Sequence, residues 1–73
     1  MTEKMRERVM ANIKEANGAL TVEFCNEAIA QKERVVEFWN NQPAWKQGPS
    51  CKNAIANAKA EIEYFQAVIE VLT

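Results

Sequence analysis

The side chains that most often carry out catalysis are scarce in this chain of 73 residues. It has no histidine and no aspartate, a single serine, Ser50, and two cysteines, Cys25 and Cys51. It therefore lacks the commonest general base, the commonest metal ligand and the usual carboxylate for magnesium. Two cysteines alone cannot complete a zinc site, and the chain has no glycine-rich phosphate loop. We expect a protein that is not an enzyme and uses no cofactor.

Lys32 is the charged residue whose position is most informative. On a helical projection it falls in the middle of an apolar arc, where a solvated lysine is not expected. One interpretation is an ion pair with Glu61 that fixes the register of two helices. Another is that Lys32, with Arg34 or Lys59, lines a helix interface and neutralises a small anionic ligand such as a phosphate. In a third, its stem covers apolar surface while the ammonium group reaches water.

Two other groups of side chains could contact a protein partner. Trp45 and Lys46 lie in a connection rich in helix-breaking residues, and tryptophan is common among interface hot spots. Alternatively, Trp45 folds back beside Trp39 and closes the open end of a helical hairpin. The second group is an acidic face whose like charges lie four residues apart and repel one another. It could meet a basic surface, or it could remain solvated. Its members are Glu23, Glu27, Glu33 and Glu37.

Charge and hydropathy exclude some partners. Nine basic and ten acidic residues give a net charge of −1, so we expect binding neither to nucleic acid nor to an anionic membrane. The chain has no uncharged run near the roughly 18 residues of a membrane span. Its first residues lack the apolar core of a signal peptide. We expect a cytoplasmic protein.

Hydrophobic periodicity predicts helices and no strands. The expected helices span residues 3–16, 22–41 and 51–72, and a loop spans 42–50. Thr2, Thr21 and Ser50 are suitable N-caps for the three helices. In the last helix, apolar residues recur at alternating spacings of four and three, a heptad seam that another helix must cover. The seam residues are Cys51, Ile55, Ala58, Ile62, Phe65, Ile69 and Leu72.

The middle helix carries an apolar arc of about 180°, which is more than one partner helix can cover. Its second partner is either the first helix or another copy of the chain. A core of this size also supplies only about 3–5 kcal/mol of stability. We therefore expect an all-α fold, a short N-terminal helix plus a long antiparallel helical hairpin, completed by homo-oligomerisation; a free-standing monomer is the alternative. In that hairpin Cys25 and Cys51 lie at opposite ends, which favours buried, reduced thiols over an intermolecular disulfide.

The chain is small, with a short first helix, a long hairpin and a terminal segment that runs Ala58-Lys59-Ala60-Glu61-Ile62-Glu63 through Leu72-Thr73. This layout resembles that of small helical accessory proteins of bacteriophages and mobile elements. Some of those proteins inhibit host defences, and others are oligomeric sponges for cyclic nucleotides. The resemblance implies a non-catalytic inhibitor that binds a larger host protein. The alternative is a sponge for a small anionic ligand at Lys32. Because no ligand-binding motif of the sponges is matched, the resemblance assigns no site residue.

Overall fold

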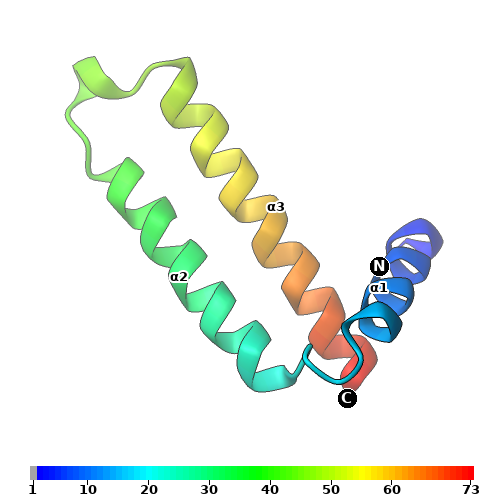
Figure 1. Ribbon diagram of the computed structural model, residues 1–73. Helices are drawn as coiled ribbons and strands as arrows, with labels where there is room; N and C mark the ends of the chain where they lie inside the picture. The colour runs from blue at the N-terminus through cyan, green and yellow to red at the C-terminus, as the bar shows by residue number, and fades with distance from the viewer. Residues whose placement is uncertain (1) are drawn as a thin grey trace.

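The computed structural model describes residues 2–73 and is all-α there, as expected from the periodicity, with no strand in that range. The elements in chain order are α1 (Glu3–Ala16), α2 (Val22–Asn40), the short 3₁₀ turn η1 (Ala44–Lys46) and α3 (Pro49–Leu72). The helices α2 and α3 run antiparallel and form the long hairpin (Figure 1). On the side of α3 away from α2, α1 lies beside the C-terminal half of α3. The molecule measures 43 × 24 × 17 Å.

Local side chains set the ends of α1 and the start of α2. The hydroxyl oxygen of Thr2 accepts a hydrogen bond from the Met5 amide at 3.2 Å, and that of Thr21 accepts one from the Phe24 amide at 3.1 Å. Each bond satisfies an amide that has no partner inside the helix, as expected for these caps. The chain leaves α1 through Asn17 and Gly18, whose φ angles of 52° and 90° are in the left-handed region.

The start of α3 differs from the prediction. The helix begins at Pro49 rather than at residue 51, and the N-cap is Gly48, so the expected cap at Ser50 is wrong. Proline suits the first helical position because its φ is already helical and the amide it lacks would have had no partner there. The helix α2 also ends one residue before the expected limit of residue 41, at Asn40.

The core is small and lies where the three helices meet. Val9 of α1, Cys25 of α2, and Ala67 and Val68 of α3 form one buried cluster. Two further buried residues of α3, Cys51 and Ala58, belong to the seam that was predicted to face α2. The first helix thus packs as an accessory layer on the hairpin. The partly buried side chains against the cluster are Met5, Ile13, Leu20, Tyr64, Phe65, Ile69 and Val71.

Both cysteines are buried and unbridged, as expected. Cys25 is completely inaccessible, and Cys51 lies at the other end of the hairpin with its sulfur 3.6 Å from the carbonyl oxygen of Trp39. An intermolecular disulfide would need an exposed sulfur atom, which neither residue offers. Burial also raises the pKa of the Cys25 thiol, so that it is protonated at neutral pH and is a poor nucleophile.

Candidate interaction surfaces

One flank of α2 is only partly covered by the rest of the chain, with Phe24 edge-on against Phe65 of α3. Because α1 packs on α3 rather than along α2, part of the apolar arc of α2 faces water. Phe24, Val35 and Phe38 are 50%, 38% and 59% exposed. These three residues and two others that lie between them recur along α2 at spacings of four, three, four and three residues. That is the spacing of a heptad seam, the second in this chain. We call this set the α2 stripe: Phe24, Ala28, Gln31, Val35 and Phe38.

Trp45 is the most exposed large hydrophobic side chain in the described part of the chain, at 80%. The expectation that it folds back to close the end of the hairpin is therefore wrong. It lies in η1, at the end of the molecule where α2 and α3 are joined (Figure 1). The ammonium group of Lys46 lies 4.9 Å from the centre of the indole ring, within the range of a cation–π contact. We call residues 41–48 the hairpin tip.

Hydrogen bonds hold the hairpin tip in one conformation. The side-chain amide of Gln47 donates to the carbonyl oxygens of Asn40 at 3.3 Å and Gln42 at 2.7 Å, so it fastens the loop to the end of α2. Within η1, the Lys46 amide donates to the carbonyl of Pro43 at 2.9 Å. The local sequence pattern did not predict that Gln47 fastens the loop to the end of α2.

Lys32 forms the ion pair that one interpretation of the sequence predicted. Its ammonium nitrogen lies 2.7 Å from a carboxylate oxygen of Glu61, the one salt bridge among residues 2–73. The two side chains are 34% and 50% exposed, so water still reaches both.

The other two basic residues predicted for an anionic ligand do not join this pair. Arg34 follows Lys32 by two residues, and Lys59 precedes Glu61 by two, so each lies about 200° around its own helix from the pair. Both are exposed. The three predicted ligand-binding residues therefore do not converge, and the charge of Lys32 is already compensated within the chain.

The acidic face of α2 is fully solvated. Glu23, Glu27, Glu33 and Glu37 are exposed, as are Arg34 and the neighbouring polar residues. None of these carboxylates belongs to a salt bridge in the described chain. The face is thus available to a basic surface.

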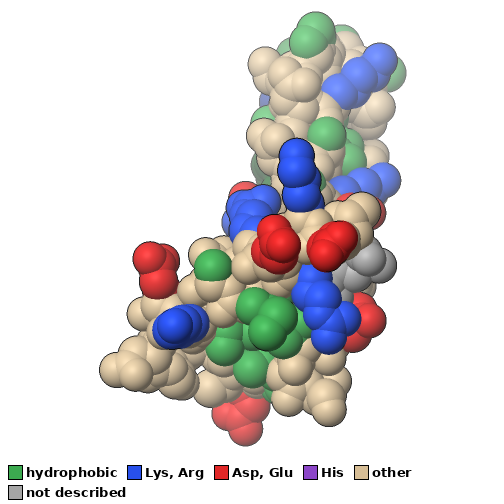
Figure 2. Space-filling model, turned by 90° about the vertical axis from the view of Figure 1, so that its right-hand side faces the viewer, with side chains coloured by type: hydrophobic (Ala, Val, Ile, Leu, Met, Phe, Trp, Pro, Cys, Tyr) green, Lys and Arg blue, Asp and Glu red, His purple; other side chains and the backbone are tan. Residues whose placement is uncertain are grey.

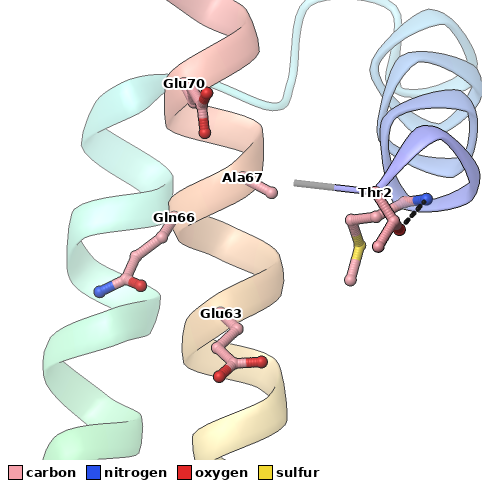
Figure 3. A pocket seen from close by; sticks show the side chains of 6 residues that line it. Thr2, Glu63, Gln66, Ala67 and Glu70 are labelled. Carbon is pink, nitrogen blue, oxygen red and sulfur yellow. Dashed lines mark hydrogen bonds between the residues drawn. The ribbon is translucent and has the colours of Figure 1, made fainter.

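A cleft between α1 and α3 was not foreseen from the sequence. It encloses about 360 Å³ and is lined by Thr2, Met5, Glu63, Gln66, Ala67 and Glu70. Figure 3 shows the side chain of Ala67 pointing from α3 toward Thr2 across the gap, with Glu63 and Glu70 to either side of it along the helix. Its floor is apolar and its charged groups are both carboxylates, spaced two helical turns apart. Within residues 2–73, no cluster of three potential metal ligands is present here or elsewhere.

Beside this cleft, Tyr64 links α3 to α1. The side-chain amide of Asn12 donates to its hydroxyl oxygen at 2.6 Å, and the guanidinium carbon of Arg8 lies 5.1 Å from the ring centre. Figure 2 shows the side of the molecule that carries α1, where hydrophobic side chains gather in a patch bordered by basic and acidic ones. The contacts of Tyr64 support a structural role, because they join two helices.

Comparison with known protein families, with curated proteins and with solved structures finds no match for this chain. No helix among the described residues has the length and apolar character that crossing a membrane requires.

Proposed function

We propose that this chain is a non-enzymatic protein-interaction module that binds a larger protein through its hairpin tip, with Trp45 as the anchor. The observation that carries the proposal is the 80% exposure of Trp45 on a loop braced by hydrogen bonds. An exposed indole has apolar surface that becomes favourable to bury in a partner's pocket.

The charges around Trp45 suit a partner with a hydrophobic pocket and an acidic rim. Lys46 lies against the indole ring and is exposed. No carboxylate occurs between Glu37 and Glu61 in the sequence, so the tip is free of negative charge. A partner would bury Trp45 in the pocket while Lys46 remains at the edge, which is the usual arrangement of an apolar hot spot within a polar rim. By occupying such a surface the chain would block the partner's other contacts, as an inhibitor does.

Affinity capture with matched variants tests the proposal. The wild-type chain, Trp45→Ala and Met10→Ala are immobilised and exposed to bacterial lysate, and the retained proteins are quantified by mass spectrometry. Met10 is the control because it is also an exposed hydrophobic residue, at 53%, but lies on α1. Since a tryptophan hot spot contributes about 2 kcal/mol or more, Trp45→Ala should weaken retention of the partner at least about 30-fold, and Met10→Ala should not.

Two results would overturn the proposal. One is a partner that Trp45→Ala retains as well as the wild-type chain does. The other is recovery of a nucleotide with no protein, which would favour the ligand-binding alternative at Lys32.

A further inference from the structure

The described chain exposes more surface than a compact monomer of its mass. Its accessible surface is 5549 Å², and its mass is 8.3 kDa. A typical folded monomer of that mass exposes about 4600 Å². The excess of roughly 950 Å² is close to the ~800 Å² that each partner buries in a standard protein interface.

The interior is correspondingly poor in large side chains. The completely buried residues are Val9, Val68 and Cys25, and the other buried residues are Cys51, Ala58 and Ala67. Among residues 2–73, no isoleucine, leucine or aromatic side chain is classed as buried. The large apolar side chains that should dominate the core instead lie at its edges, so the folded chain still has apolar surface to bury.

The α2 stripe is the part of that surface with the regularity of a helix-packing seam. It runs along a helix of 19 residues, about 28 Å long, with positions spaced for knobs-into-holes packing. Trp45 does not belong to it, because the tip lies beyond the end of α2. The spacing of the stripe therefore suits a second helix of similar length as its partner.

We propose that this second helix is α2 of another copy of the chain, so that the two α2 stripes pack on each other about a two-fold axis near Gln31. The stripe has aromatic residues at both ends, Phe24 and Phe38, and its polar residue, Gln31, in the middle. A two-fold contact centred on the stripe brings each Gln31 near its own counterpart. There the two side-chain amides can donate to and accept from each other, whereas an unrelated apolar helix would leave Gln31 unsatisfied.

The charges beside the stripe also permit contact between identical copies. Four of the five stripe positions are directly preceded by a charged residue on the outer edge: Glu23, Glu27, Arg34 and Glu37. In an antiparallel contact centred on Gln31, Glu27 of each copy would lie near Arg34 of the other. Glu23 and Glu37 would lie at the solvated ends of the contact. The net charge of −1 gives only weak repulsion between two copies.

Two independent measurements on the full chain test the inference. The first is the mass in solution by light scattering for the wild type, Val35→Glu and Met10→Glu at concentrations from about 1 to 500 µM. We expect the wild type and Met10→Glu to reach twice the chain mass and Val35→Glu to stay at 8.3 kDa. Circular dichroism checks that each variant keeps its helices. A wild type that remains at 8.3 kDa over the whole range would overturn the inference.

The second measurement is disulfide cross-linking, which does not depend on a disruptive substitution. Gln31→Cys places a thiol at the proposed axis, and Ala30→Cys places one on the outer face of the same helix turn. Both native cysteines are buried and add little background. Under mild oxidation, Gln31→Cys should give a covalent dimer at least tenfold faster than Ala30→Cys. Equal cross-linking rates for the two cysteine variants would refute the inference. It would also be refuted if Val35→Glu keeps its helices and still reaches twice the chain mass, because self-association would then use another surface.

Discussion

Lys32 can lie on the apolar side of α2 because Glu61 reaches it from α3. The 2.7 Å pair is a third to a half exposed, so water screens the attraction and both long side chains lose freedom in forming it. Such a pair contributes more to register than to stability. If α3 slipped along α2 by one heptad, Glu61 would move about 10 Å and leave Lys32 against apolar side chains.

We predict that Lys32→Met changes the free energy of unfolding by less than about 1 kcal/mol. A double-mutant cycle with Glu61→Gln should give a coupling of roughly 0.2–1 kcal/mol that decreases in 1 M salt. Urea unfolding followed by circular dichroism measures both. Lys59→Met is the matched control, because Lys59 is exposed and belongs to no salt bridge in the described chain. A coupling of 3 kcal/mol or more would indicate a desolvated pair and contradict the structure.

At the scale of the elements, α1 packs on the hairpin around one completely buried residue. Val9 is completely buried against Cys25, Ala67 and Val68, and it is the one residue of α1 that is classed as buried. The contacts of Tyr64 lie at the edge of this packing. Met5 and Ile13 of α1 pack only partly buried around this cluster, so the docking of α1 should respond most to the volume of the Val9 side chain.

Val9→Ala and Met10→Ala form a matched pair of neighbouring substitutions on α1. Val9→Ala should lower the free energy of unfolding by about 2 kcal/mol, because it removes buried methyl groups and leaves a cavity. Met10→Ala should change it by less than about 0.5 kcal/mol, since Met10 is 53% exposed. Urea unfolding measures the difference. Equal effects of the two substitutions would mean that α1 is not docked through Val9.

Local signals predicted the elements well, and contacts between distant residues account for the differences. Thr2 and Thr21 cap the first two helices because a cap depends on only three or four successive residues. The Lys32–Glu61 pair followed from the periodicities of two helices and their antiparallel order. The sequence left two positions open for Trp45, exposed or folded back beside Trp39, and it gave no signal of the cleft between α1 and α3. The position of Trp45 depends on hydrogen bonds made by Gln47 across the loop, and the cleft depends on how α1 crosses α3.

At the scale of the whole molecule, the thin core and the excess surface have one consequence for stability. A single core of this size supplies only about 3–5 kcal/mol, and here it lacks large buried side chains. If two copies associate through the α2 stripe, folding and association are linked, and the folded state is favoured by mass action. Stability then depends on the concentration of the chain. A monomer has no such dependence.

We therefore predict that the melting temperature rises with protein concentration. For a dimer that unfolds to two separate chains, a hundredfold increase should raise it by roughly 5–10 °C, given an unfolding enthalpy of about 0.7 kcal/mol per residue. Thermal melts at 2 and 200 µM, followed by circular dichroism, measure the shift. Val35→Glu should melt at one temperature at both concentrations, whereas Met10→Glu should behave like the wild type. A wild-type midpoint independent of concentration would mean that the core described here is stable without a second copy and that the α2 stripe has another occupant or none.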